Sequence, residues 1–139
     1  EFFVQPRRHC GYYNFEVNCG GWLHLSYVQD PTRMDDGDLS WRTLVPAGEA
    51  AAVGIYHSMP RLVPDEILER REWVIQLQIP LGVMERYVGA LGDLGGQTWQ
   101  ANLYKCGDRT SHPHWATWAP IGEECNFHQP WHFRPIHFA

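Results

Sequence analysis

Aromatic rings and polar side chains are interspersed through residues 99–133, in the last third of the chain. The flat faces of indole and phenyl rings can stack on the apolar C–H side of a sugar ring, while amides, carboxylates and cations bond its hydroxyl groups. The residues that could do this chemistry are Trp118, Phe127, Trp131, Glu124, Asn126, Gln129, Lys105 and Arg109. Their combination favours the binding of a hydroxyl-rich ligand.

The same rings could instead belong to a hydrophobic core. We expect Trp99 to be buried because it lies on an alternating strand pattern, and we expect Trp115 to plug a loop. Prolines and glycines surround Trp118, Phe127 and Trp131, and such residues keep a loop at the surface. These three rings are therefore the predicted stacking contacts.

Catalytic arrangements are poorly represented. The carboxylates that could act near the aromatic segment are Glu16, Asp108, Glu123 and Glu124. Their spacing does not mark a general acid and its base. Ser111 stands beside His112, but the surrounding sequence lacks the Gly-x-Ser-x-Gly motif of many hydrolases. We therefore do not expect these residues to form an enzyme.

The four cysteines allow three complete pairings, and the sequence does not choose among them. They are Cys10, Cys19, Cys106 and Cys125. Each could be a small buried hydrophobic residue, whereas export would favour at least one disulfide. Zinc is disfavoured because Cys106, His112, His114, Cys125 and His128 form no Cys-x-x-Cys or His-x-x-x-His pair.

Four aspartates gather around Gly37, at positions 30, 35, 36 and 38. Clustered carboxylates beside a glycine can ligate calcium, but this spacing lacks the regularity of an EF-hand. A solvated turn is the favoured interpretation. These residues on their own therefore predict no certain cofactor.

Length and charge limit the classes of protein to consider. The chain has 139 residues, which suits one domain, and carries a formal net charge of −5. Nucleic acid is disfavoured as a partner, because phosphates require clustered lysine and arginine. No apolar run approaches the ~20 residues of a membrane span.

The hydrophobic pattern predicts short strands. We expect strands at residues 2–4, 12–18, 22–28, 50–59, 73–79, 99–104 and 135–139, and one short helix within residues 81–91. In the strand at 73–79, Trp73, Ile75, Leu77 and Ile79 should face a core while Gln76 and Gln78 face outward. Loops are expected at residues 29–40 and after Lys105. These elements predict a mainly β protein, an antiparallel β-sandwich with one short helix.

Several segments together resemble the family 9 carbohydrate-binding module. They are Gly-Tyr-Tyr-Asn-Phe-Glu-Val-Asn-Cys-Gly at residues 11–20, the strand at 73–80, Ala-Asn-Leu-Tyr-Lys-Cys-Gly-Asp at 101–108 and Asn-Phe-His at 126–128. The resemblance spans nearly the whole chain and implies a β-sandwich. Characterised members hold the reducing end of a glucan or xylan chain between two tryptophans, and usually bind a structural calcium ion.

The resemblance also implies roles for individual residues. Glu1 falls in the family's Val-Glu-x-Phe strand, whose glutamate bonds the sugar, and Glu16 stands where an arginine can reach hydroxyl groups. Phe127 aligns near the second stacking ring, and residues 124–126 lie around a hydrogen-bonding asparagine. The family's first tryptophan would precede Glu1. We therefore expect a single domain over residues 1–139 that lacks N-terminal strands of the sandwich, which would leave an unpaired edge.

The resulting prediction is a monomeric, non-catalytic module that binds a plant-type polysaccharide or oligosaccharide in a protein exported by a bacterium. The predicted site residues are Glu1, Glu16, Trp118, Glu124, Asn126, Phe127, Gln129 and Trp131. One alternative is a targeting module of a secreted glycoside hydrolase, and another is a structural or interaction sandwich without a sugar site. A redox or haem-binding sandwich is remote, because the chain has three methionines.

Overall fold

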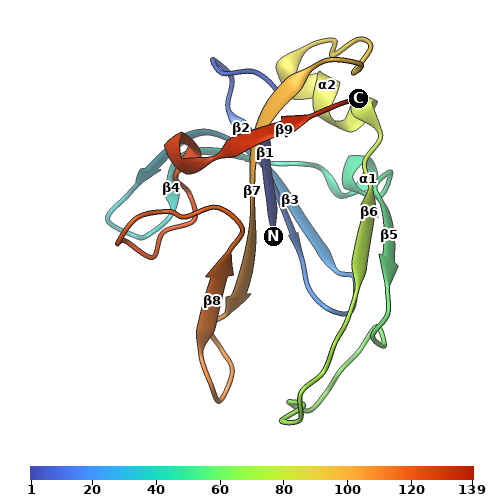
Figure 1. The fold of residues 1–139 in the computed structure, drawn as a ribbon, viewed down its shortest axis with the longest axis vertical. Coiled ribbons are helices and arrows are strands. Elements are labelled where there is room, and N and C mark those ends of the chain that lie inside the picture. The colour runs from blue at the N-terminus through green and yellow to red at the C-terminus, as the bar shows by residue number, and fades with distance from the viewer.

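The computed structural model describes all of residues 1–139 (Figure 1). Strands dominate, and the helices are short. The elements are β1 (Phe2–Gln5), β2 (Tyr12–Val17), β3 (Leu23–Arg33), β4 (Leu39–Leu44), α1 (Ala47–Ala50), β5 (Gly54–His57), β6 (Ile75–Gln78), α2 (Leu81–Val88), β7 (Thr98–Gly107), β8 (His114–Thr117), the 3-10 turn η1 (Pro130–His132) and β9 (Arg134–His137). The predicted β-sandwich with a short helix is confirmed.

One large antiparallel sheet holds seven of the nine strands, in the order β4-β3-β2-β1-β7-β8. Strand β9 pairs with the first half of β7, and β8 pairs with its second half. The remaining strands, β5 and β6, form a separate two-stranded sheet. In Figure 1 the β5–β6 and β7–β8 hairpins extend as two arms on either side of the chain's first residue.

The two faces of the large sheet carry separate hydrophobic cores. The face toward β5 and β6 buries Val4, Tyr13, Phe15, Leu25 and Trp99, together with Val83, Met84 and Val88 of α2. The opposite face buries Phe3, Tyr12, Val28, Tyr104 and Phe133. Both faces of β1, of most of β2 and of the first half of β7 are therefore covered, so these segments do not alternate between core and solvent as an exposed sheet would.

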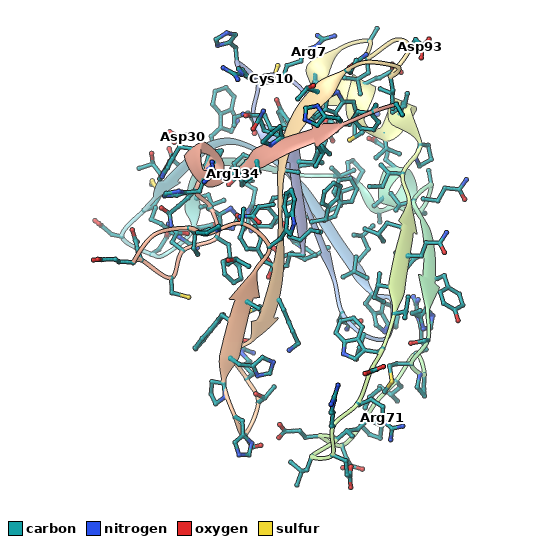
Figure 2. All side chains as sticks on the ribbon, in the orientation of Figure 1. Arg7, Cys10, Asp30, Arg71, Asp93 and Arg134 are labelled. Atoms are coloured by element: carbon teal, nitrogen blue, oxygen red, sulfur yellow. The ribbon has the colours of Figure 1, made fainter.

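Helix α2 begins after Pro80 and ends at Gly89, whose φ of 74° suits glycine. Arg7, labelled in Figure 2, connects this helix to the turn between β1 and β2 by donating a hydrogen bond from Nη1 to the Val88 carbonyl oxygen at 2.9 Å. The predicted helix is confirmed.

Residues 118–133 cross the second face of the large sheet. Asn102 of β7 anchors this segment, because its fully buried amide donates to the Ala119 carbonyl at 3.1 Å and accepts from the Ala119 N–H at 2.9 Å. These two bonds satisfy both ends of a buried polar side chain. A long segment with little regular structure is thereby fixed as the cover of a core.

Several expected boundaries were wrong because strand pairing continues through polar residues. Strand β3 extends to Arg33 and β4 starts at Leu39, so most of the predicted loop at 29–40 is a bulged hairpin. Strand β7 continues past Lys105 and turns back into β8. The strand expected at 50–59 is limited to β5, because residues 47–50 form α1.

Burial corrected some expectations and confirmed others. Trp99 is 3% exposed, as predicted, but Trp115 is 50% exposed and does not plug a loop. The alternation in β6 is confirmed, since Ile75 and Leu77 are half-buried and the glutamines are exposed. Trp73, which was expected to face the core, precedes β6 and is 39% exposed.

His128 lies in the core of the second face. Its Nδ1 is 2.7 Å from the Tyr12 hydroxyl, and its ring lies 5.0 Å from the Phe3 ring. Burial, together with the positive charges of Arg33 and Arg42, lowers the pKa of His128 to about 4. The imidazole is therefore neutral at physiological pH.

This histidine should make the fold sensitive to acid. Between pH 6.5 and 4 the unfolded chain takes up a proton that the folded chain does not, so the free energy of unfolding falls as pH falls. We expect His128→Gln to reduce this loss by about 2 kcal/mol, measured by urea unfolding at pH 7 and pH 4. The matched variant His137→Gln, whose ring is exposed on β9, should behave as the unaltered chain. Equal pH slopes for all three proteins would contradict this assignment.

Candidate functional site

The β7–β8 hairpin separates two hollows in the surface. The larger, here called the apolar groove, has a volume of about 640 Å³ and lies between β6 and the large sheet. It is lined by Glu1, Phe2, Phe15, Val17, Trp73, Ile75, Leu77, Ile79, Leu103, Tyr104, Lys105, Ala116, Thr117 and Trp118. Eleven of these fourteen residues are hydrophobic, so the groove offers few partners for hydroxyl groups.

The smaller hollow, here called the acidic hollow, has a volume of about 230 Å³. It lies between β8 and the segment that follows it, and is lined by Trp115, Ala116, Thr117, Ile121, Gly122, Glu123, Glu124, Cys125 and Phe127. An indole, a phenyl ring, two carboxylates and a hydroxyl thus meet in one place. This set has the ring faces and hydrogen-bond acceptors that a sugar needs.

Strand geometry explains why a different tryptophan lines each of the two hollows. Successive side chains of a strand point to opposite faces. Trp118 lies just past β8, yet its N–H still donates to the Leu103 carbonyl at 2.8 Å, so the pairing continues through it. Trp115 therefore lines the acidic hollow and Trp118 lines the apolar groove, although the two indoles are similarly exposed, at 50% and 53%.

Glu1 and Glu16 lie on neighbouring strands at the edge of the second face. Burial, together with the negative charge of Glu16, raises the pKa of Glu1 to about 7. The Glu16 carboxylate accepts a hydrogen bond from Asn14 Nδ2 at 2.6 Å. The raised pKa of Glu1 favours retention of its proton, so this carboxyl group can donate a hydrogen bond where the Glu16 carboxylate can only accept one.

Tyr104 connects this pair to the acidic hollow. Its N–H donates to the Glu1 carbonyl at 2.9 Å, and its ring stacks on Phe127 with centroids 4.3 Å apart and planes 14° from parallel. On β8, Thr117 stands opposite Tyr104 and lines the hollow. Tyr104 thus links the backbone of Glu1, which lines the apolar groove, to the Phe127 ring, which lines the acidic hollow.

The eight predicted site residues are only partly brought together. Glu124 and Phe127 line the acidic hollow, whereas Glu1 lines the apolar groove and Glu16 lines neither hollow. Trp118 lies across the hairpin in the apolar groove. Trp131 is 69% exposed on η1 and lines neither hollow.

Gln129 and Asn126 act mainly on the loop itself. The buried Gln129 amide donates to the carbonyl oxygens of Glu124 and Asn126, at 3.3 and 2.7 Å. Asn126 Oδ1 accepts the His128 N–H at 3.1 Å. These bonds fix the wall of the acidic hollow, so the two residues hold Glu124 and Phe127 in position.

Trp115 is the site residue that sequence reasoning missed. Its signal was the short alternating run His-Trp-Ala-Thr at residues 114–117, which follows a turn rich in glycine, serine and proline. That pattern indicates the return strand of a hairpin. An indole on such a strand can lie open on one face.

The structure holds no group of three or more His, Cys, Asp and Glu side chains arranged to bind a metal ion. All four cysteines are free thiols. In the aspartate-rich turn, Asp30 accepts hydrogen bonds from Thr32 and Asp38 pairs with Arg42 at 2.9 Å. This turn, as it stands, does not fit a calcium ion. No helix is long and apolar enough to cross a membrane.

The raised pKa of Glu1 has a measurable effect on stability. Because the folded chain keeps a proton that the unfolded chain loses, stability should fall as pH rises from about 4.5 to about 7. We expect Glu1→Gln to raise the melting temperature by about 4 °C at pH 8 and to leave it unchanged at pH 4.5. Glu72→Gln, at an exposed carboxylate, is the control. A gain at pH 4.5 equal to that at pH 8 would show that the effect is not titration.

Comparison with known proteins adds independent findings. A family model described as Carbohydrate-binding family 9 matches residues 1–138. The crystal structure of a candidate carbohydrate-binding protein from Bacteroides uniformis, at 2.70 Å resolution, is similar with a TM-score of 0.80 and 32% sequence identity. The match covers 96% of this chain and 57% of that chain, so the sequence spans little over half of the relative's length. No curated protein matches significantly.

Proposed function

Because the chain belongs to carbohydrate-binding family 9, whose modules bind carbohydrate without catalysis, we propose that its acidic hollow binds a saccharide by ring stacking and hydrogen bonds. The observation that carries this proposal is the half-exposed Trp115 indole in one hollow with Glu123, Glu124 and Phe127. The indole takes the C–H face of the sugar. The carboxylates take its hydroxyl groups.

The polar lining supports the acidic hollow over the larger groove. A sugar in the apolar groove would place most of its hydroxyl groups against hydrocarbon, and an unpaired buried hydroxyl costs roughly 1–3 kcal/mol. In the acidic hollow the same groups meet the carboxylates of Glu123 and Glu124, while Thr117 lines both hollows. The chemistry of the lining residues therefore favours the acidic hollow as the sugar site, although the apolar groove is larger.

The volume of the acidic hollow favours one end of a glycan. At about 230 Å³ it is smaller than the roughly 300–1,000 Å³ of typical ligand pockets, which suits a single sugar ring. We therefore propose the end of a plant-type polysaccharide or oligosaccharide, with reducing ends of xylan or glucan as first candidates. The family's characterised ligands support this choice. We also propose that the module is monomeric and belongs to a protein exported by a bacterium.

A second candidate function is the targeting of a catalytic partner. In that case the module directs a glycoside hydrolase, encoded elsewhere in the same polypeptide, to its substrate. The length of the solved relative supports this candidate, because the match covers only 57% of that chain. The sugar site would be the same in both cases.

A matched pair of tryptophan variants tests the site. Binding of xylo- and gluco-oligosaccharides is measured by calorimetry on the polypeptide that naturally contains residues 1–139. Trp115→Ala should bind about tenfold more weakly than the unaltered protein, because the stacked ring face is lost. A tenfold loss of affinity corresponds to roughly 1.4 kcal/mol. Trp118→Ala, equally exposed on the other side of the hairpin, should bind within about twofold of the unaltered protein.

The opposite pattern, with Trp118→Ala weakened and Trp115→Ala unaffected, would move the site to the apolar groove. Binding by neither the variants nor the unaltered protein, across a panel of glycans, would reject the proposed function. Release of new reducing ends from a polysaccharide by residues 1–139 alone would contradict a non-catalytic role.

A further inference from the structure

The β5–β6 hairpin has an outward face, here called the β5–β6 face, that points away from the rest of the molecule. Successive residues of a strand point to opposite faces, so Ile55 and Leu77 pack against the core while their neighbours point outward. In Figure 1 no strand or helix lies to the right of this hairpin. The exposed residues that point outward, none of which is charged, are Gly54, Tyr56, Ser58, Val74, Gln76 and Gln78.

Tyr56 lies at the centre of the β5–β6 face. It stands directly opposite Gln76, while Gly54 stands opposite Gln78. Opposite residues of an antiparallel pair have Cβ atoms about 5 Å apart, and diagonal neighbours remain within reach of aromatic and long side chains. The Tyr56 ring, which is 59% exposed, is therefore flanked by two primary amides. Each amide can donate and accept hydrogen bonds.

The β5–β6 face is open, unlike the two hollows. Its outward residues line neither the apolar groove nor the acidic hollow. Beside the ring, Gly54 has no side chain, and Gln78 Oε1 lies only 3.4 Å from where a Cβ atom of residue 54 would be. On an open surface a polymer can extend past the stacking ring in both directions, whereas the acidic hollow of about 230 Å³ suits one end of a chain.

The hairpin that carries this face is fixed to the large sheet. The Arg61 guanidinium lies 4.0 Å from the centre of the Trp22 ring, and its Nη1 donates to the Gly21 carbonyl oxygen at 3.2 Å. Trp22 Nε1 donates in return to the Arg61 carbonyl oxygen at 3.2 Å. At the far end of the hairpin, Glu66 accepts hydrogen bonds from the N–H and the hydroxyl of Ser111, at 3.0 and 3.1 Å. A surface that is already fixed loses little conformational entropy when it binds.

The size and charge of the β5–β6 face exclude several kinds of partner. Two strands of four residues, with ~3.4 Å per residue and ~4.8 Å between strands, present about 130 Å². A stable protein interface buries roughly 800 Å² on each partner, so a second copy of the chain or another protein is disfavoured. The face carries no lysine or arginine, which disfavours a polyanion. A ring between amides matches the C–H side and the hydroxyl groups of a neutral sugar.

We propose that the β5–β6 face is a second saccharide-binding surface, which binds the interior of a long neutral polysaccharide chain; this inference rests on the saccharide binding proposed above. Tyr56 stacks on the C–H side of one sugar unit, and the amides of Gln76 and Gln78 bond hydroxyl groups beside it. The acidic hollow takes one end of a chain and the β5–β6 face takes its interior. The two surfaces therefore recognise different parts of the same polymer.

Affinity electrophoresis tests this inference, with the polypeptide that naturally contains residues 1–139 and gels that contain a soluble β-glucan or arabinoxylan. A long chain has one reducing end and many interior units, so retention in the gel reports mainly on interior contacts. Tyr56→Ala should weaken retention about fivefold, because the stacking ring is lost, whereas Tyr56→Phe keeps the ring and should stay within about twofold.

Trp41→Ala is the matched control, at a ring 62% exposed on β4. It should be retained within about twofold of the unaltered protein. Equal retention of Tyr56→Ala and Trp41→Ala would overturn the inference. Absence of retention of the unaltered protein in every gel would also overturn it.

A second measurement does not depend on a variant that folds. In the unaltered polypeptide, oxidation of Tyr56 by hydroxyl radicals should fall severalfold when the same polysaccharide is present, since the stacked sugar covers the ring. Oxidation of Trp41 should stay the same. Equal oxidation of Tyr56 with and without a polysaccharide that retards the protein would contradict the inference.

The inference and the proposed function can fail separately. If Trp115→Ala abolishes retention and Tyr56→Ala preserves it, chains bind only through the acidic hollow, which overturns the inference and leaves the proposed function. If Tyr56→Ala loses retention while Trp115→Ala keeps its affinity for short oligosaccharides, the acidic hollow is not the sugar site and the β5–β6 face is supported.

Discussion

The large sheet has to bury both of its faces, and this requirement organises the molecule. Strands β1, β2 and β7 carry bulky rings on both sides, such as Phe3 and Tyr12 on one face and Tyr13 and Phe15 on the other. One face is covered by α2 and the β5–β6 hairpin, and the other by residues 118–133. Wherever the cover stops short of the sheet, a hollow with aromatic walls remains.

The segments that cover the two faces of the large sheet differ in polarity, and so do the surfaces beside them. The segment at residues 118–133 is held by side-chain amides, with Asn102 fully buried beneath it and Gln129 bracing it from within. The surface beside it is therefore polar as well as aromatic, which suits a hydroxyl-rich ligand. The β5–β6 hairpin contributes aliphatic side chains, so the space beside it resembles an unfinished core.

The sequence predicted the fold class well, because the strongest strand patterns and the helix at α2 do not depend on distant contacts. Ile75 and Leu77 face inward as their alternation indicates. The local sequence pattern failed to predict strand ends where strand pairing continues through polar residues. Polar residues 29–33 join β3 because β4 supplies hydrogen bonds, and β7 runs through Lys105 because β8 returns beside it.

The candidate site was harder to predict, since a sandwich strand divides neighbouring residues between two faces. Glu124 and Phe127 are close in sequence and stay together. Trp115 and Trp118 are equally close, yet they are separated because the odd spacing between them reverses the direction of the side chain. Gln129 and Asn126 have the chemistry of ligand contacts, but their amides hold the backbone of their own loop.

The β7–β8 hairpin is a wall shared by the two hollows, since Ala116 and Thr117 line both of them. The antiparallel ladder between Tyr104 and His114 therefore sets the position of one wall of each hollow. A substitution that shifts this single ladder would change the shape of two separate surfaces at once.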